Sequence, residues 1–454
     1  MGLSIVILAA GQGTRMRSRW PKVLHRVAGR TLLEHVYQTA SSLQHDSLII
    51  IYGHGGSQVP EALAHVDAEW IEQTEQLGTG HAVAQALPRI DDNDDVLLLN
   101  GDVPLVCAGT LERLTAAARD SGFALLTAIL DDPGGYGRIV RDGSGKVVRI
   151  VEEKDASMDE RAIREINTGM MVVRGALLKR WIEALDKGNR QGEYYLTDIV
   201  AMAVREHVNI ECIQPHSLNE IMGINDRVQL ARVENTYRQM QAEQLMQDGV
   251  TLVDPARFDL RGTLKAGMDT VIDVNVIIEG EVSLGDDVRI GANCVLRDVA
   301  VGDNAEIQPN CVIEHATIGR QCRIGPFARI RPDTVLADGV HIGNFVEVKK
   351  SEIGPGSKVN HLSYIGDTEI GRGVNVGAGT ITCNYDGASK HKTIIEDDVF
   401  IGSDTQLVAP VRVAAGATIG AGTTVTRDVE AGTLAIGRAE QRTVKGWKRP
   451  KKGG

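Results

Sequence analysis

The sequence has few aromatic side chains, no excess of positive charge and no long apolar run. Its formal net charge of −11 at pH 7 argues against nucleic acid or an anionic membrane as the main partner. The short apolar segment Ser4–Ala10 runs directly into a glycine-rich loop, unlike a signal peptide, and no window approaches a transmembrane span. We therefore expect a cytoplasmic protein in which local basic residues and backbone N–H groups meet any anionic substrate.

Cysteine is also scarce. The six cysteines, at positions 107, 212, 294, 311, 322 and 383, form no Cys-x-x-Cys pair. Three of them, Cys294, Cys311 and Cys322, stand at small, inward-facing positions of the repeat described next. They are therefore predicted to be buried thiols in a reducing compartment.

A six-residue repeat runs from Ile272 to about Glu430. An aliphatic residue opens each repeat, and a small residue usually stands four places later, as in Ile290-Gly-Ala-Asn-Cys-Val. We count about 25 repeats, with one residue missing after each of Leu296, Ile313, Val348 and Ile365 and an insertion from Thr382 to Ile394. Three repeats would form one triangular coil of about 18 residues, so the pattern predicts a parallel β-helix of roughly eight coils, ~40 Å long.

The first half of the chain alternates apolar strands with helical patterns, which predicts an α/β, Rossmann-like domain with a largely parallel sheet. The predicted strands are Ser4–Ala9, Ser47–Tyr52, Val96–Leu99, Phe123–Ile129 and Gly169–Val173. The predicted helices are Thr31–Leu43, Thr79–Leu87 and Thr110–Arg119. Ligands bind at the carboxyl ends of strands in such sheets, and most candidate residues fall there.

The first candidate is a glycine-rich loop, Leu8-Ala-Ala-Gly11-Gln-Gly13-Thr-Arg15-Met16, followed by Pro21-Lys22. Glycines let the backbone approach a phosphate. Met16 replaces the third glycine of a dinucleotide fingerprint, and no Walker motif is present. Two cations beside the loop, Arg15 and Lys22, fit a triphosphate better than NAD.

Two further segments follow apolar strands or open helices. Asp102, in Asn100-Gly101-Asp102, is placed to hold Mg²⁺, although an Asp after Gly is also a common turn former. Gln73-Thr-Glu-Gln76-Leu-Gly78-Thr79 leads into a predicted helix.

Three outward positions of the repeat carry a second set of candidates. Arg331 and Lys349 open repeats one coil apart, so they should stack on one face and could grip a phosphate. His361 projects outward too, and Tyr364, Asn375, Asn384 and Tyr385 cluster with it in sequence.

The first three segments resemble the sugar-1-phosphate nucleotidyltransferases. Further matches are Gly137 in Gly-Tyr-Gly-Arg, Glu152 in Val-Glu-Glu-Lys, Asn167 in Ile-Asn-Thr-Gly and Asn225 in Gly-Ile-Asn-Asp. Together with the repeat, the whole chain is identified as a member of a bacterial family, the bifunctional N-acetylglucosamine-1-phosphate uridylyltransferases/glucosamine-1-phosphate N-acetyltransferases. The resemblance implies a left-handed β-helix and a homotrimer. It also implies a role in UDP-N-acetylglucosamine synthesis for peptidoglycan and lipopolysaccharide, and so in cell-wall biogenesis and cell shape.

For the first domain, the resemblance implies uridylyl transfer from UTP to N-acetylglucosamine 1-phosphate with release of pyrophosphate. The implied nucleotide- and sugar-binding residues are Leu8, Ala9, Ala10, Gly11, Arg15, Lys22, Gln73, Gly78, Thr79, Asn100, Gly101, Asp102, Gly137, Glu152, Asn167 and Asn225. Of these, Asp102 and Asn225 would ligate Mg²⁺. Close relatives are expected to have an aromatic residue at position 100, where this chain has Asn.

For the repeat domain, the resemblance implies acetyl transfer from acetyl-CoA to glucosamine 1-phosphate, with His361 as general base. The implied sugar-phosphate-binding residues are Arg331, Lys349, Tyr364 and Asn375. The implied acetyl-CoA-binding residues are Ala378, Asn384, Tyr385, Ser403, Ala421 and Arg438. No acyl-enzyme is needed, so Cys383 is a weak candidate nucleophile. The basic tail Lys445–Lys452 would either fold over the coenzyme phosphates or be solvated.

The division that follows is a uridylyltransferase domain at 1–226, a linker helix at 227–249 and an acetyltransferase domain with its tail at 250–454. The helix would span ~30 Å and separate the two sites. Two alternatives remain open at this point. One is a nucleotidyltransferase for glucose or mannose 1-phosphate with the repeat as a trimerising scaffold, and the other is a non-enzymatic assembly protein.

Overall fold

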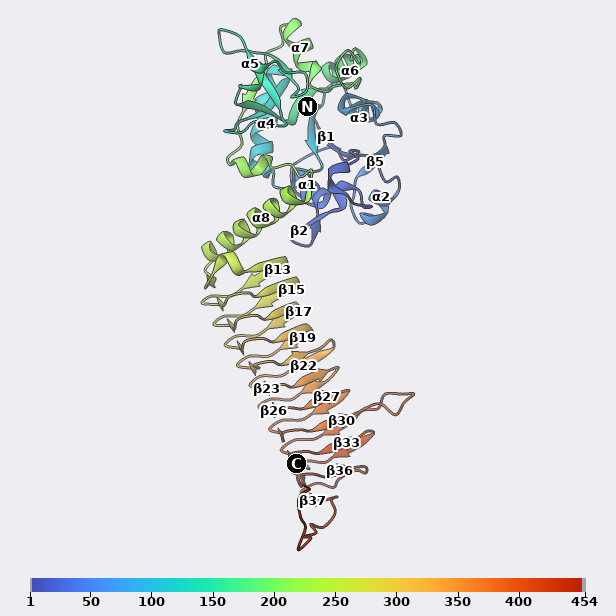
Figure 1. Cartoon of the computed structure of the whole chain (residues 1–454), viewed down its shortest axis with the longest axis vertical. Helices are drawn as coiled ribbons and strands as arrows, with labels where there is room; N and C mark the ends of the chain where they lie inside the picture. Colours follow the sequence, from blue (N-terminus) through green and yellow to red (C-terminus); the bar gives the residue numbers. More distant parts are fainter. Residues whose placement is uncertain (1, 451–454) are drawn as a thin grey trace. The chain divides into compact units, whose positions relative to one another are not determined.

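The computed structural model describes residues 2–450, which form two compact units divided at residues 237/238 (Figure 1). The boundary falls inside one long helix, α8 (Arg227–Gln247). Among the described residues, no helix combines the length and apolar character needed to cross a membrane.

The first unit is built on a nine-stranded sheet whose main path is β11-β7-β10-β6-β1-β4-β5. The bounds are β1 Leu3–Leu8, β4 Ser47–Tyr52, β5 Glu69–Glu72, β6 Asp95–Asn100, β7 Phe123–Ile129, β8 Gly137–Arg141, β9 Val147–Val151, β10 Glu165–Arg174 and β11 Glu211–Ile213. The strand predicted at Gly169–Val173 is the end of β10, which runs antiparallel to both β6 and β7. The remaining neighbours on the main path pair in parallel, as predicted.

Helices cover both faces of this sheet because its strands bury residues on both sides. In β1, Ile5 and Ile7 pack into a core with α1 and α4, whereas Val6 packs into another core with α3, α6 and α7. The bounds are α1 Leu32–Ser41, α2 Gln58–Ala62, α3 Thr79–Ala86, α4 Ala108–Ser121, α5 Met158–Arg161, α6 Gly175–Glu183 and α7 Asp198–Arg205. Short elements complete the unit: the β2–β3 ribbon (Arg26–Val27 and Arg30–Thr31) and the 3-10 turns Thr14–Met16, Lys22–Leu24, Leu87–Arg89 and Leu218–Ile221.

The predicted linker helix is confirmed as α8. In its first half, Val233 is fully buried in the first unit with Met16 and Leu32. In its second half, Ala242 and Leu245 pack into the core of the second unit. The helix stops before Gly249, whose φ of +100° suits glycine. Its halves are thus parts of two cores rather than a solvated spacer.

The second unit is a parallel β-helix, which confirms the predicted architecture. One face is an 11-stranded sheet: β12 Thr251–Leu252, β14 Val271–Ile272, β16 Arg289–Ile290, β18 Glu306–Ile307, β20 Arg323–Ile324, β23 His341–Asn344, β26 Lys358–His361, β29 Asn375–Val376, β32 Phe400–Ile401, β35 Thr418–Ile419 and β37 Leu434–Ala435. A 3-10 turn, Pro255–Arg257, follows β12.

The other two faces share a 15-stranded sheet. Its first strands are long and turn one corner: β13 Asp259–Ala266, β15 Ile277–Leu284, β17 Val295–Val301 and β19 Val312–Ile318. The two halves of β19 pair with separate strands, β21 and β22, and the faces are distinct from there on. One face continues as β22 Thr334–Leu336, β25 Glu352–Ile353, β28 Thr368–Ile370, β31 Thr393–Ile395 and β34 Val411–Val413. The other continues as β21 Arg329–Ile330, β24 Glu347–Lys349, β27 Tyr364–Gly366, β30 Ile381–Cys383, β33 Gln406–Val408 and β36 Thr424–Val425.

The strand register confirms the predicted repeat and its irregularities. Ile272 pairs with Ile290, 18 positions on, but Ile290 pairs with Ile307, 17 positions on, because one residue is missing after Leu296. Across the insertion, Val376 still pairs with Ile401. The predicted number of coils was too low: the 11-stranded face extends from β12 to β37, beyond both ends of the recognisable repeat. Terminal coils face a cap or solvent and need not keep the repeat signature.

The three faces of the β-helix form a prism, and the interior and corners of this prism follow the sequence pattern. Cys294, Cys311 and Cys322 are buried, as predicted. The corners are turned by residues with positive φ, many of them Asn or Asp, such as Asn293 at +62° and Asp287 at +56°. The insertion between β30 and β31 projects from one corner (Figure 1).

Candidate functional site

Two adjoining cavities lie at the carboxyl ends of β1 and β6 in the first unit. The first has a volume of about 480 Å³. The predicted residues that line it are Leu8, Ala9, Ala10, Gly11, Lys22, Gln73, Gly78, Thr79, Asn100 and Asp102. The glycine-rich loop and the Gln73–Thr79 segment, which are far apart in sequence, thus face one space.

The second cavity, of about 340 Å³, shares Leu8, Thr79, Asn100 and Asp102 with the first. It adds five more predicted residues: Arg15, Gly137, Glu152, Asn167 and Asn225. Gly101 lines neither cavity. Its N–H donates to the Leu8 carbonyl at 2.9 Å, and a Cβ there would lie 3.1 Å from the same oxygen, so it lets the two strand ends approach.

Lys22 joins the two predicted metal-ligating side chains at the boundary between the cavities. Its Nζ donates to Asp102 Oδ2 and, at 3.3 Å, to Asn225 Oδ1. The side chains of Lys22 and Asp102 are only 12% and 21% exposed. A carboxylate and an amide oxygen therefore share one cation in a partly enclosed position, and the acceptor oxygens that Mg²⁺ prefers lie side by side.

Glu152 is a buried carboxylate in the second cavity. It accepts a hydrogen bond from Thr197 Oγ1 at 2.9 Å. Burial, reinforced by the nearby carboxylates of Asp198 and Asp155, raises its pKa above the ordinary value. A Cβ at Gly137 would lie 3.6 Å from its oxygens, so glycine leaves the carboxylate open to the cavity. Such a group suits hydrogen bonding to sugar hydroxyls.

Asn100 lines both cavities, but its side chain is engaged by the protein. Its Nδ2 donates to the Thr168 carbonyl at 3.1 Å, beside Gly169, where φ is +82°. The amide thus ties the end of β6 to β10, where an aromatic ring could not make this bond.

Sequence reasoning missed several lining residues, among them Gln12, Tyr136, Glu193 and Thr197. Gln12 Nε2 donates to Gln76 Oε1 at 2.8 Å, so a hydrogen bond links the glycine-rich loop to the Gln73–Thr79 segment. Both glutamines stand inside the segments singled out above, which was a usable signal. Glu193 and Thr197 come from a segment without any motif, and only the fold brings them here.

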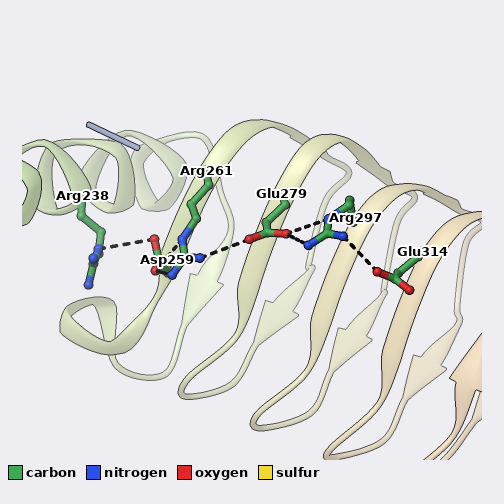
Figure 2. Close-up of polar contacts among 6 residues, drawn as sticks. All are labelled: Arg238, Asp259, Arg261, Glu279, Arg297 and Glu314. Atoms are coloured by element: carbon green, nitrogen blue, oxygen red, sulfur yellow. Dashed lines mark hydrogen bonds and ion pairs between the residues drawn. The ribbon is translucent and has the colours of Figure 1, made fainter. Parts of the chain in front are cut away.

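In the prism, a ladder of alternating charges runs up one face (Figure 2). Arg238 on α8 pairs with Asp259 at 3.6 Å, and the ladder continues through Arg261, Glu279, Arg297 and Glu314. From Arg261 onward these residues occupy equivalent positions on successive coils. Each charge is compensated by the coil above or below it.

The same column continues to Arg331 and Lys349, where the alternation stops. The register places Arg331 above Glu314, and it places Lys349 above Arg331, as predicted for this pair. Arg331 is bound at 2.7 Å by Glu347, but Lys349 faces another cation, Lys390 of the insertion, which sequence reasoning missed. Lys390 and, less strongly, Arg331 lower the pKa of Lys349. Three cations thus cluster around one carboxylate, Glu347, an arrangement chemically suited to an anion such as phosphate.

His361 stands on a second column, along a corner of the prism. The register places Ala378, Ser403 and Ala421 at the equivalent positions of the next three coils. Backbone hydrogen bonds link them, from Gly379 N to His361 O, Asp404 N to Ala378 O and Gly422 N to Ser403 O. At the far end, an Arg438 guanidinium nitrogen donates to the Ala421 carbonyl. The exposed imidazole is thus followed by small residues and then a cation.

The remaining predicted residues lie on the insertion or on the coils next to it. Asn384 is buried, with its Nδ2 2.5 Å from Asp367 Oδ2 and 3.5 Å from the Tyr364 hydroxyl. Tyr385 is exposed on the insertion. Asn375 pairs with Lys358, three positions before His361. Of the predicted basic tail, Lys445–Pro450 is exposed without regular structure, and the rest lies outside the described residues.

The fold and the two sites define a class: a nucleotidyltransferase unit joined to a hexapeptide-repeat transferase. Comparison with known families agrees. The MobA-like NTP transferase domain matches residues 5–194, the GMPPB C-terminal domain residues 261–366, and the bacterial transferase hexapeptide (six repeats) residues 392–427.

Curated relatives give the family. The chain is 61% identical over 453 residues to the bifunctional protein GlmU of Methylococcus capsulatus, covering 100% of this chain and 98% of that protein. It is 57% identical over 450 residues to the bifunctional protein GlmU of Aromatoleum aromaticum, covering 99% of each. The chain belongs to the family of bifunctional GlmU proteins. The prediction of an enzyme with nucleotidyltransferase and acetyltransferase activities is confirmed, and the two alternatives left open above fall away.

Proposed function

We propose that the residues gathered in the two units have the roles that the resemblance assigns. The prism would transfer the acetyl group of acetyl-CoA to the amine of glucosamine 1-phosphate. The first unit would then transfer the uridylyl group of UTP to the product. The observation that carries this assignment is convergence: in each unit, chemically matched side chains from distant segments meet around one space or along one edge.

In the uridylyl transfer, the sugar phosphate oxygen attacks the α-phosphorus of UTP and pyrophosphate leaves. Such a reaction depends on positioning and charge neutralisation. Arg15 and Lys22 would neutralise the triphosphate, with the nucleoside in the first cavity. Glu152 and Asn167 would hold the sugar in the second cavity. The phosphates would lie at the boundary between the cavities, next to Lys22, because residues there line both spaces.

We assign Asp102 and Asn225 as the side chains that would hold Mg²⁺. Their oxygens already share a cation, the Lys22 ammonium. Among residues 2–450, no group of three or more His, Cys, Asp or Glu side chains forms a cage for a metal ion. The carboxylate of Asp102 and the amide oxygen of Asn225 suit Mg²⁺, which commonly takes one or two carboxylates and completes its shell with substrate phosphates and water. The ion would screen the repulsion between the two phosphate groups.

In the acetyl transfer, the sugar amine attacks the thioester carbonyl, loses a proton to His361, and the coenzyme leaves as its thiol. Arg331, Lys349 and Lys390 would bind the sugar phosphate. The small residues Ala378, Ser403 and Ala421, aligned on successive coils, would leave room for the extended coenzyme arm. Arg438 at its far end would meet a coenzyme phosphate.

We also propose a homotrimer, with the acetyl-transfer site closed by a second chain. His361 is exposed on a corner, where a single prism offers it no enclosing wall. Beside it, Phe327, Phe345 and Leu362 on consecutive coils are 50%, 55% and 63% exposed, and all have positive φ. Bulky side chains in this strained conformation indicate an apolar surface that another chain covers. Free cysteines and these substrates fit a cytoplasmic enzyme.

The test is to mix the purified protein with glucosamine 1-phosphate, acetyl-CoA and UTP and to follow thiol and pyrophosphate release separately. His361→Ala is expected to abolish thiol release while pyrophosphate release from added N-acetylglucosamine 1-phosphate continues unchanged. Loss of both activities in that variant, with the fold intact by circular dichroism, would contradict the assignment of separate sites.

A further inference from the structure

The ring of His361 makes a side-chain hydrogen bond that no role described so far explains. Its Nδ1 lies 2.8 Å from Asn344 Oδ1, on the coil directly before it. The two residues pair in register, Asn344 opposite His361. They belong to the corner column that is otherwise occupied near this point by Pro309, Pro326, Ala378 and Ser403. Two hydrogen-bonding side chains on consecutive coils stand out in a column of small or rigid residues.

The backbone is shaped so that these two residues meet. β23 and β26 are four residues long, where most strands on this face have two, and the extra pair is Asn344 with His361. Gly343 makes the close approach of the two coils feasible, since a Cβ there would lie 1.9 Å from the Asn360 carbonyl oxygen. The Leu362 N–H then donates to the Asn344 carbonyl at 3.1 Å. The imidazole is therefore held from the coil beneath it.

We infer that Asn344 is the positioning residue of the acetyl-transfer base, accepting a hydrogen bond from His361 Nδ1–H and so keeping Nε2 unprotonated and directed at the sugar amine. This inference rests on the proposed role of His361. A neutral imidazole has one donor and one acceptor nitrogen, and a bond at one fixes the state of the other. An amide acceptor fixes the tautomer without adding a negative charge.

The charged side chains near the imidazole are alternative partners for His361 Nδ1–H. His341 and Arg323, on the same face of the preceding coils, and Lys358, on the strand of His361 itself, are bases. On the following coil the equivalent residue is Ala378. Across the corner, the Glu347 carboxylate is bound by Arg331. As cations, Arg323 and Lys358 carry only hydrogen-bond donors, and Ala378 has no polar side-chain atom. A neutral His341 has an acceptor nitrogen, but the partner that His361 Nδ1 meets at 2.8 Å is Asn344 Oδ1.

The test compares N344A and N344D by the pH profile of acetyl transfer in the full-length enzyme. N344A should lower kcat by about 10- to 100-fold and leave the KM for acetyl-CoA within about twofold, because it loses orientation rather than substrate binding. N344D retains an acceptor and should recover most of kcat at alkaline pH. Its added charge should move the acidic limb of the profile to higher pH by about one unit.

Uridylyl transfer by the same preparations serves as the folding control and should not change. Wild-type kcat in N344A, or equal losses in N344A and N344D with an unshifted limb, would overturn the positioning role. H361A distinguishes a wrong proposed function from a wrong positioning role for Asn344. Acetyl transfer that survives in H361A refutes the proposed function, whereas its loss in H361A together with unaffected Asn344 variants refutes only this inference.

Discussion

The cation cluster of the prism makes a quantitative prediction for Lys349→Met. Arg331 and Lys349 lie on adjacent coils, ~4.8 Å apart, and Lys390 repels Lys349 strongly enough to lower its pKa. A phosphate charge at ~4 Å from one cation gains about 1 kcal/mol in water and about 4 kcal/mol at an effective dielectric constant of 20. Because Lys349 is near solvent, we take ~1–2 kcal/mol. The KM for glucosamine 1-phosphate should therefore rise about 5- to 30-fold.

Arg297→Met is the matched control. Arg297 occupies the same outward column three coils from Lys349, but Glu279 and Glu314 compensate it. Removing it changes the net charge equally and should leave that KM within about twofold. The assay is initial-rate thiol release at fixed ionic strength, repeated at higher salt, where the K349M effect should shrink. Equal increases in KM for the two variants would show that only long-range charge matters, and the phosphate-binding assignment would be wrong.

Lys349→Met should weaken substrate binding, but it should not lower the stability of the fold. The folded-state pKa of Lys349 lies below the ordinary 10.5, so the unfolded chain binds this proton more tightly. Wild-type protein should thus gain unfolding free energy as pH rises towards 10.5, and K349M should lack this gain. At neutral pH, K349M should unfold at an equal or higher temperature than wild type while binding its substrate more weakly. A lower unfolding temperature would contradict the picture of three repelling cations.

Two further predictions concern the first unit. A fragment of residues 1–237 should retain uridylyl transfer and lack acetyl transfer; a fragment of 1–226 should be less stable by about 2–3 kcal/mol in urea unfolding, because it loses the buried Val233. Equal stability would mean that α8 does not support this unit. Glu152→Gln should stabilise the unit at pH 7 by on the order of 1 kcal/mol, because burial raises the pKa of Glu152 and ionisation is therefore costly in the folded state. The difference should disappear as pH falls below the ordinary value of 4.5, where Glu152 is protonated in both states, and a constant difference down to pH 3 would exclude this cause.

The fold was predictable wherever the sequence has a period. A missing residue in the repeat shifts the register from 18 to 17, and the strand pairs show each such shift. The end coils were missed because their sequence has no repeat to read. The direction of β10 was missed for a different reason: a strand buried on both faces shows the same apolar run whichever way it points.

The candidate site was predictable only where its residues belong to recognisable segments. Lys22, Asp102 and Asn225 were all singled out from motifs, and they meet although they come from three distant stretches. By contrast, Thr197 reaches Glu152 from a segment without a motif, and Lys390 reaches Lys349 from the insertion. Both contacts depend on how a loop returns to the sheet or prism. Loop trajectories follow from tertiary packing and not from local pattern, so periodicity and propensity carry no information about them.

The insertion shows how a regular prism acquires chemistry without losing its register. It leaves the chain after β30 and returns at β31, and Val376 still pairs with Ile401 on the 11-stranded face. The corner column of His361, Ala378 and Ser403 is therefore continuous across the coil that contains the insertion. Meanwhile the insertion carries Lys390 to the neighbouring column, where the alternating ladder ends in two stacked cations. An uninterrupted repeat could supply the column of His361 and the column of Arg331 and Lys349. It could not supply Lys390, which comes from outside the repeat. The insertion thus adds the third cation at the end of the charge ladder, where we propose that the sugar phosphate binds.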